Sequence, residues 1–326
     1  MIKMSTGPLE EKNQPEPLFG INVTPTANGV DNAFEIAKIS DKLGIDLISV
    51  QDHAYNGSFL DTWTLITALA TSTKNIHFMT NVADVPLRDP QLAKSAATLD
   101  ILTKGRVELG VGAGAFWRAI KGYGGPSRTP AEAVDALEEA IQVIRLIWNI
   151  DGSNNRASFN GKFYRLDGAQ TGPRPFHPIR IWLGAYGPKM LRLTGRLSDG
   201  WTPSYGYAPP DQIPQMQQII EQSISATRRN SNEVRRNYNL AGIVSESDSK
   251  KVDHQEHAVI REQDGLLVGS VDFWVDTIVK FYKDLRMDSF TFWPANESAQ
   301  EVELFANKIV PRMKEEIKKL AIAKNS

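Results

Sequence analysis

Residues 106–114 read RVELGVGAG, an apolar run that ends in alternate glycines. Its aliphatic residues recur at every second position, as in a β-strand whose larger side chains share one face. Gly110, Gly112 and Gly114 remove side chains where a flat ring or another backbone segment must come close, with Ala113 as the only small side chain between the last two. Tight packing at the edge of a sheet is an equally simple explanation.

The spacing of these glycines excludes one familiar nucleotide site. A dinucleotide fingerprint has the pattern G-x-G-x-x-G and an acidic residue about 20 positions later, at the end of the next strand. Residues 110–114 have a different spacing, and no such acidic residue follows. We therefore do not expect a tightly held nicotinamide cofactor.

On both sides of this strand, strand-like apolar runs alternate with helix-like periodic runs, which is typical of βαβ units and a parallel sheet. Strands are predicted at residues 18–23, 46–50, 75–82, 106–112, 179–185, 200–203, 238–245 and 288–293. Helices are predicted between them, among others at residues 61–72, 129–148, 188–197, 211–228, 271–284 and 300–319, with one more starting at Asp89-Pro90. Eight pairs predict a single (β/α)8 TIM barrel, an α/β fold, although a doubly wound fold with six or seven strands would leave a similar pattern.

Three segments lie outside these pairs. Residues 156–167 predict a β-hairpin with Asn160-Gly161 as its turn. Residues 115–128 and 246–265 are long and polar or glycine-rich. We expect these two to be insertion loops at the C-terminal mouth of the barrel that close over a ligand.

The composition limits the kind of protein. The chain has 326 residues, of which 41% are hydrophobic, so a large core is possible; its net charge of −1 gives no sign of a nucleic-acid or membrane partner. It has no cysteine, which excludes disulfides and thiolate chemistry. Residues 1–17 are polar and lack the apolar run of a signal peptide. We expect a mobile tail at 1–17, a barrel domain at 18–326 and a cytoplasmic protein.

Candidate site residues follow the predicted strands, because barrel enzymes carry their sites at the C-terminal ends of the strands. Asp52 and His53 come directly after the second strand. A histidine there can move a proton, since its ordinary pKa lies near 6.5. The alternative is that Asp52 caps a loop and His53 only fills space.

A second candidate follows the fifth strand. Gly184, Ala185, Tyr186 and Gly187 precede Pro188, which is a good first residue for a helix. The free backbone N–H groups of that helix start suit a phosphate, and a plain helix cap is the alternative.

Aromatic residues are predicted to gather near the same end of the barrel and to form an apolar cleft for a ring or acyl substrate. They are Tyr55, Phe116, Trp117, Tyr186, Trp201, Tyr205, Tyr207 and Trp293. Packing in the core or at the rim is an equally good explanation for most of them. Metal binding is not expected. His254 and His257 are the only neighbouring histidines, and their polar surroundings favour a solvated loop.

Taken together, four segments resemble the bacterial-luciferase-like monooxygenases, a family of FMN- or deazaflavin-dependent oxidoreductases. They are residues 48–53 (ISVQDH), residues 81–90 with Arg88 inside, residues 99–114 ending in GRVELGVGAG, and residues 182–201 from WLGA to LSDGW. A weaker fifth is Leu267-Val268-Gly269-Ser270. The resemblance spans residues 18 to about 310.

The resemblance implies a barrel that binds FMN or the 8-hydroxy-5-deazaflavin coenzyme at its mouth. It also implies a non-prolyl cis peptide at Asn81-Val82 that supports the ring. His53 matches a position that is catalytic or contacts the ring in the deazaflavin branch. The sugar-phosphate dehydrogenases of that branch have an acidic Glu after the Gly-x-Gly segment, where this chain has Ala115. That departure argues against sugar-phosphate oxidation.

The main functional hypothesis is a monooxygenase. Reduced FMN from a separate flavin reductase would react with oxygen and oxidise an apolar organic substrate, with His53 as the catalytic residue. Asp52, Asn81, Val82, Gly112, Ala113 and Gly114 would surround the ring, and residues 184–187 would hold the phosphate. The alternatives are hydride transfer with the deazaflavin and a non-catalytic, flavin-less binding protein. The expected assembly is a homodimer.

Overall fold

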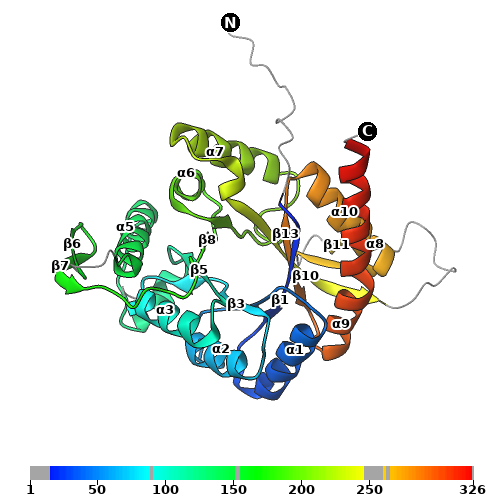
Figure 1. Cartoon of the computed structure of the whole chain (residues 1–326), viewed down its shortest axis with the longest axis horizontal. Coiled ribbons are helices and arrows are strands. Elements are labelled where there is room, and N and C mark those ends of the chain that lie inside the picture. Colours follow the sequence, from blue (N-terminus) through cyan, green and yellow to red (C-terminus); the bar gives the residue numbers. More distant parts are fainter. Residues whose placement is uncertain (1–14, 89–90, 151–154, 246–259, 262–264, 325–326) are drawn as a thin grey trace, which may run out of the picture.

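The computed structural model describes residues 15–88, 91–150, 155–245, 260–261 and 265–324. Its centre is a closed barrel of eight parallel strands (Figure 1). In barrel order they are β1 (Leu18–Val23), β2 (Leu47–Val50), β3 (His77–Thr80), β5 (Val107–Gly112), β8 (Ile181–Leu183), β9 (Gly200–Trp201), β10 (Arg235–Ser245) and β13 (Ser289–Pro294). The ring closes because β10 pairs with β9 on one side and with β13 on the other, and β13 pairs with β1. The predicted (β/α)8 barrel is confirmed.

Helices form the outer layer of the ring (Figure 1). The long ones are α1 (Val30–Lys42), α2 (Thr62–Thr71), α3 (Gln91–Thr103), α5 (Pro130–Trp148), α6 (Pro188–Leu197), α7 (Ile213–Ala226), α8 (Val271–Asp284) and α10 (Val310–Lys324). The aliphatic residues of β5, Val107, Leu109 and Val111, belong to one hydrophobic core with the inner faces of these helices. The side chains that point into the barrel are therefore free to be polar or absent.

Local capping signals explain where several helices begin. Thr129 and Glu132 form a capping box ahead of α5, with Pro130 in the first turn. Asp61 accepts a hydrogen bond from the Thr64 backbone N–H at the start of α2. These helices start within a residue of their predicted positions, and α6 and α8 match their predicted bounds. The predicted start at Asp89-Pro90 lies outside the described residues.

The predicted loops contain more structure than expected. Residues 115–128 include a short helix, α4 (Trp117–Gly122). The segment predicted as a loop at 246–265 is followed by strand β12 (Leu266–Ser270), which pairs in parallel with β10. Two residues of that segment form β11 (Ile260–Arg261), antiparallel to β12, and 246–259 and 262–264 lie outside the described residues. An added side chain at Gly242 would lie 1.9 Å from the Leu267 carbonyl oxygen, so this pairing depends on a glycine in a distant strand.

Other short elements complete the chain. The single helix predicted at 300–319 is instead α9 (Ala299–Leu304), a π-helical turn η3 (Phe305–Ile309) and α10. Two 3-10 turns, η1 (Ala27–Gly29) and η2 (Ser231–Glu233), lie in connections. β4 (Ala83–Asp84) pairs with the end of β5. The separation into a tail at 1–17 and a domain at 18–326 stays a prediction, and residues 1–14 lie outside the described part.

The predicted hairpin is present, but its turn is longer than expected. β6 (Arg156–Asn160) and β7 (Arg165–Gln170) form a separate two-stranded sheet beyond α5 (Figure 1). The turn comprises residues 161–164 rather than Asn160-Gly161 alone. The carboxylate of Glu139 in α5 accepts hydrogen bonds from the backbone N–H groups of Lys162, Phe163 and Tyr164. This contact with the helix favours the wider turn.

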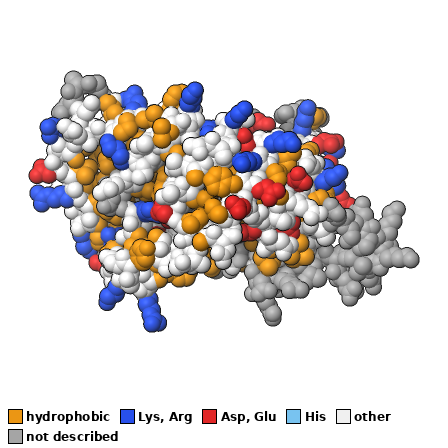
Figure 2. All heavy atoms as spheres, turned by 90° about the horizontal axis from the view of Figure 1, so that it is seen from below, with side chains coloured by type: hydrophobic (Ala, Val, Ile, Leu, Met, Phe, Trp, Pro, Cys, Tyr) orange, Lys and Arg blue, Asp and Glu red, His pale blue; other side chains and the backbone are white. Residues whose placement is uncertain are grey.

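The outer surface mixes charges and small hydrophobic groups. On the side of the barrel seen in Figure 2, basic and acidic side chains are interspersed with hydrophobic ones. Among the described helices, none has both the length and the hydropathy needed to cross a bilayer.

We predict that Gly110→Ala destabilises the protein strongly. The new methyl group would lie 2.0 Å from the Thr80 carbonyl oxygen, and the Thr80 hydroxyl already holds the Gly110 carbonyl at 2.7 Å, so neither strand can move freely. The free energy of unfolding should fall by about 2–3 kcal/mol or more, measured by urea unfolding. Gly57→Ala is the control, because nothing lies within 4 Å of its added methyl group. Equal stability of the two variants would contradict the proposed close contact.

Candidate active site at the mouth of the barrel

A polar network fills the barrel interior just below the mouth. Asn81 donates hydrogen bonds from Nδ2 to Asn22 Oδ1 at 3.2 Å and to Asn239 Oδ1 at 3.1 Å. Ser49 Oγ donates to Asn22 Oδ1 at 2.8 Å. Asn237 continues the network by donating to Thr202 Oγ1. Asn81 is therefore held by groups from β1 and β10, on two other sides of the barrel.

The end of β3 turns inward above this network. The Asn81-Val82 peptide bond is cis, as predicted. The Val82 side chain lies against strand β5, where a methyl group on Gly112 would be 2.8 Å away, and faces Gly184 at the end of β8 at about 3.5 Å. The glycines of β5 thus admit the backbone and side chains of β3. The structure brings the predicted residues Asn81, Val82, Gly112 and Gly184 together.

The residues after Gly112 continue into the mouth. Ala113 is partly buried against the hydrophobic core. Gly114 has φ +89°, a conformation that favours glycine, and an added side chain there would be 2.9 Å from Pro86. The segment after β5 therefore packs closely on the segment after β4.

His53 forms the centre of a small aromatic group at the end of β2. A hydrogen bond of 2.8 Å joins its Nδ1 to the Tyr55 hydroxyl, and its ring lies 5.8 Å from that of Phe116. Burial lowers the pKa of His53 below its ordinary value of 6.5, and the negative charge of Asp52 opposes this shift. The imidazole is therefore neutral at neutral pH and can accept a proton.

Asp52 pairs with an arginine that is distant in the sequence. It is 1% exposed, and its two carboxylate oxygens accept hydrogen bonds from Arg88 Nε at 3.1 Å and Nη2 at 2.8 Å. Arg88 also pairs with Asp61, the N-cap of α2. Asp52 thus ties the end of β2 to the segment that follows β4.

Asp84 is a buried acid that the sequence reasoning missed. It is the last residue of β4 and is 7% exposed. Its Oδ1 is buried without a hydrogen-bond partner among the described residues. Burial, together with the negative charge of Asp52, raises the pKa of Asp84 to about 7, and Arg88 partly offsets this shift. A single Asp inside the run Val-Ala-Asp-Val-Pro has no local pattern that would mark it as functional.

The start of α6 has the predicted geometry. Gly187 is its N-cap in an extended conformation, Pro188 lies in the first turn, and no side chain caps the helix. An added methyl group at Gly187 would meet nothing within 4 Å, so the space beside this N-cap is open among the described residues. The Lys189 ammonium is directed away, to Asp135 and the Ala131 carbonyl of α5. Ala185 is buried, and its carbonyl accepts a hydrogen bond from Trp201 Nε1.

The aromatic residues divide into two classes. Tyr55, Phe116, Trp117, Tyr186, Tyr207 and Trp293 keep some exposure, and the rings of Tyr186 and Tyr207 lie 5.7 Å apart. Trp201 and Tyr205 are buried core residues, so the prediction that they line the cleft is wrong. Both belong to the hydrophobic core that packs around the barrel, and burial there outweighs their position near the predicted mouth.

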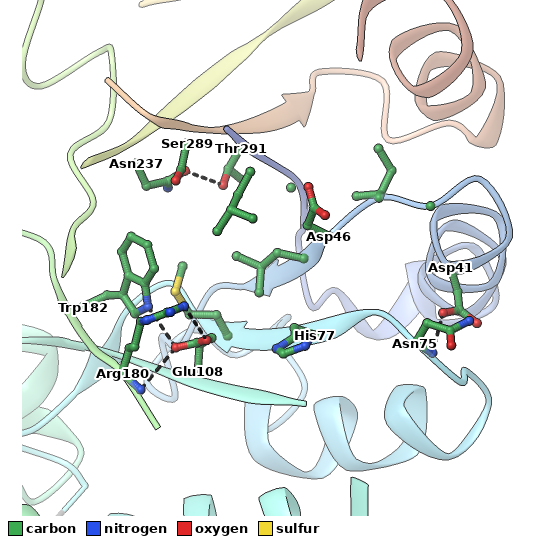
Figure 3. A pocket seen from close by; sticks show the side chains of 16 residues that line it. Asp41, Asp46, Asn75, His77, Glu108, Arg180, Trp182, Asn237, Ser289 and Thr291 are labelled. Carbon is green, nitrogen blue, oxygen red and sulfur yellow. Dashed lines mark hydrogen bonds and ion pairs between the residues drawn. The ribbon is translucent and has the colours of Figure 1, made fainter. Parts of the chain in front are cut away.

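A separate cavity lies at the opposite end of the barrel (Figure 3). It has a volume of about 480 Å³ and is lined by the first residues of β1, β2, β3 and β13. Its Glu108 accepts hydrogen bonds from the Arg180 backbone N–H and from Trp182 Nε1. Asp41 accepts three from backbone N–H groups of residues 74–76. These carboxylates mainly close the lower end of the barrel, and none of the predicted site residues lines the cavity.

The described residues contain no group of three or more His, Asp or Glu side chains arranged to hold a metal ion. His254 and His257 lie outside the described part of the chain.

Two curated proteins are similar to this chain over part of its length. The F420-dependent glucose-6-phosphate dehydrogenase of Amycolatopsis mediterranei (strain U-32) is 32% identical over 181 residues, 53% of this chain and 53% of that protein. The phthiodiolone/phenolphthiodiolone dimycocerosates ketoreductase of Mycobacterium kansasii is 34% identical over 155 residues, 46% of this chain and 41% of that protein. The chain thus spans about half the length of these relatives.

Solved structures share the fold at lower identity. An F420-dependent secondary alcohol dehydrogenase in complex with an F420-acetone adduct has a TM-score of 0.76 and 18% identity over 91% of this chain and 99% of that one. A monooxygenase from Streptomyces bottropensis has a TM-score of 0.75 and 20% identity over 90% of this chain and 99% of that one. At these identities the likeness concerns the barrel alone.

A sequence profile describes the whole barrel. Residues 17–301 match the profile of the luciferase-like monooxygenases, from the start of β1 to the start of α9. The match includes every strand of the barrel and all the predicted site residues. The chain therefore belongs to the luciferase-like monooxygenase family of oxidoreductases.

Proposed function

We propose that this protein is a deazaflavin-dependent oxidoreductase that transfers a hydride between the coenzyme and a small organic substrate at the mouth of the barrel. The observation that carries the proposal is the sequence similarity to F420-dependent dehydrogenases, at 32% identity over half the chain. The monooxygenase from Streptomyces bottropensis is only 20% identical, so its likeness in fold does not favour oxygen chemistry. This reverses the order of the two hypotheses drawn from the sequence.

The groups at the mouth suit a planar, polar ring with a phosphate. Asn22 Nδ2 and Asp84 Oδ1 are buried without partners among the described residues, so a bound ring could supply their missing hydrogen bonds. The backbone from Gly112 to Gly114 and Gly184 offers surfaces without bulky side chains, and the uncapped start of α6 offers N–H groups to an anion. When bound, the deazaflavin would accept or donate the hydride.

The chain's own residues would orient the reactants and handle the proton. Asn81, held by Asn22 and Asn239, would fix the ring from below. His53 would hold or move a proton, and Tyr55 would orient its imidazole through their hydrogen bond. Phe116, 55% exposed beside His53, would give the substrate an apolar contact. We therefore propose a small apolar alcohol or ketone as substrate. The absence of an acidic side chain at Ala115 is consistent with this substrate class.

We further propose that the protein is a homodimer in the cytoplasm and that it works without a separate flavin reductase. Hydride transfer from the deazaflavin needs no such reductase, whereas the FMN hypothesis does.

Anaerobic titration separates the two cofactors. We expect the purified protein to bind the deazaflavin coenzyme at micromolar strength. We also expect it to reduce the coenzyme with short secondary alcohols, and the loss of the coenzyme's visible absorbance measures this reaction. Substrate oxidation that requires both reduced FMN and oxygen would overturn this proposal in favour of the monooxygenase. If neither cofactor binds, the barrel is a flavin-less binding protein.

The phosphate site has a separate test. If the start of α6 holds a phosphate, the deazariboflavin without phosphate should bind about 10- to 150-fold more weakly than the phosphorylated form, since charge-assisted hydrogen bonds contribute about 1.5–3 kcal/mol. Lys189→Ala should change neither affinity much, because its ammonium faces α5. Calorimetry measures both. Equal affinities of the two ligands would show that the phosphate binds elsewhere.

His53→Asn should lower turnover by about 10²–10⁴-fold while changing coenzyme affinity much less. The base form of His53 is the neutral one, so wild-type activity should hold at neutral pH and fall on acidification through a pKa below 6.5, where burial has moved it. The variant should lose this acidic limb. His77→Asn, which alters a half-buried histidine at the other end of the barrel, is the control. An unchanged rate and pH profile in the His53 variant would show that this residue only packs against its neighbours and moves no proton.

A further inference from the structure

A carboxyl group at the mouth has no structural role among the described contacts. Asp84 is 7% exposed and its Oδ1 lies buried without a partner, and the contacts of the described residues include no ion pair or side-chain hydrogen bond to its other oxygen. Its backbone carbonyl does accept hydrogen bonds from the N–H groups of Leu87 and Arg88, so the turn after β4 does not need the side chain. A buried carboxylate without hydrogen bonds is costly, and such a group is retained where it has another task.

The surroundings of Asp84 distinguish it from its neighbour Asp52. Arg88 makes its two charged hydrogen bonds to Asp52 and a third to Asp61, so its guanidinium is engaged by these two carboxylates. From the end of β2, Asp52 repels a negative charge on Asp84, and from the segment after β4, Arg88 partly offsets that effect. Tyr55 faces the same region from the β2–α2 connection, and burial, together with the negative charges of Asp84 and Asp52, raises the pKa of its hydroxyl.

The segment after β5 lies beside the carboxyl. A methyl group on Gly114 would lie 3.2 Å from Asp84 Oδ1 and 3.1 Å from Trp117, so the glycine lets this segment pack directly against the carboxyl. Gly114 and Trp117 bring no charge to this space. Asp84 therefore faces carboxylate, guanidinium and phenol groups on one side and an uncharged backbone on the other.

We propose that Asp84 is a catalytic carboxyl that exchanges a proton with the oxygen of the alcohol or carbonyl substrate. This inference rests on the proposed function. In the reductive direction, the hydride forms a C–H bond at the carbonyl carbon, the C–O π pair takes the proton of the Asp84 carboxyl, and Asp84 becomes a carboxylate. The carbonyl is reduced and the deazaflavin is oxidised. In the oxidative direction the carboxylate takes the hydroxyl proton, and the carbinol carbon loses the hydride to the coenzyme.

The protonation behaviour of Asp84 supports this role. With a pKa of about 7, the group is close to half protonated at neutral pH, which suits an acid in one direction and a base in the other. The raised pKa also affects stability. Between the unfolded value near 3.8 and about 7, the folded protein holds a proton that the unfolded chain has lost, so this group lowers stability as the pH rises through that range.

Asp84→Asn tests the catalytic role of Asp84 and the raised pKa of its carboxyl, with Asp61→Asn as the matched control. Asp61 contacts the same arginine but is more exposed, and asparagine is also a good N-cap. The first measurement is thermal unfolding of the ligand-free protein from pH 4 to 8. Relative to wild type and Asp61→Asn, the Asp84 variant should gain stability progressively between pH 4 and 7. The second is anaerobic reduction of the deazaflavin by short secondary alcohols, in which Asp84→Asn should be about 10²–10⁴-fold slower with coenzyme affinity within a few fold of wild type.

The outcomes separate the hypotheses. If Asp84→Asn changes the dependence of stability on pH but turns over normally, the catalytic role is overturned. Asp84 would then be a buried acid without a part in the reaction. A slow variant whose stability profile matches wild type would overturn the raised-pKa account of how Asp84 acts. If the wild-type protein binds no deazaflavin, the proposed function fails and the catalytic role of Asp84 fails with it, while the stability measurement still reports the protonation of the carboxyl.

Discussion

The close approach of β3 to β5 is the contact on which the mouth of the barrel depends. Gly110 allows the Thr80 carbonyl to reach the α-carbon of the neighbouring strand, and the Thr80 hydroxyl returns a hydrogen bond to the Gly110 carbonyl. Above this point the chain turns at Asn81-Val82, and Val82 occupies the space left by Gly112. The short strand β4 can then pair with the end of β5 and bring Asp84 into the mouth. A side chain at either glycine would displace all of these groups.

The parts of the structure that depend on local signals could be predicted from the sequence. The start of α6 follows from Gly187 and Pro188, and the start of α5 follows from Thr129, Pro130 and Glu132. The barrel itself follows from the alternation of apolar strands and periodic helices, and the cis peptide from the family resemblance. The roles of His53 and the other predicted site residues in binding and catalysis stay predictions.

The parts that depend on distant contacts could not be predicted in this way. β12 forms because Gly242, about 25 residues earlier, admits its backbone. The wide hairpin turn at 161–164 depends on Glu139 in the preceding helix. The partner of Asp52 is Arg88, which lies 36 residues away, and the burial of Asp84 depends on the pairing of β4 with β5. Residue type and spacing carry no information on such partners.

The polar network inside the barrel has a consequence for the order of folding. Its hydrogen bonds join residues separated by 59 positions, from Asn22 to Asn81, and by 158 positions, from Asn81 to Asn239. Contacts between such distant segments form only after the entropy of closing long loops has been overcome. We infer that this network forms late in folding, after the strands that contribute to it. The lumen network, and with it the floor of the mouth, would then assemble when the ring closes.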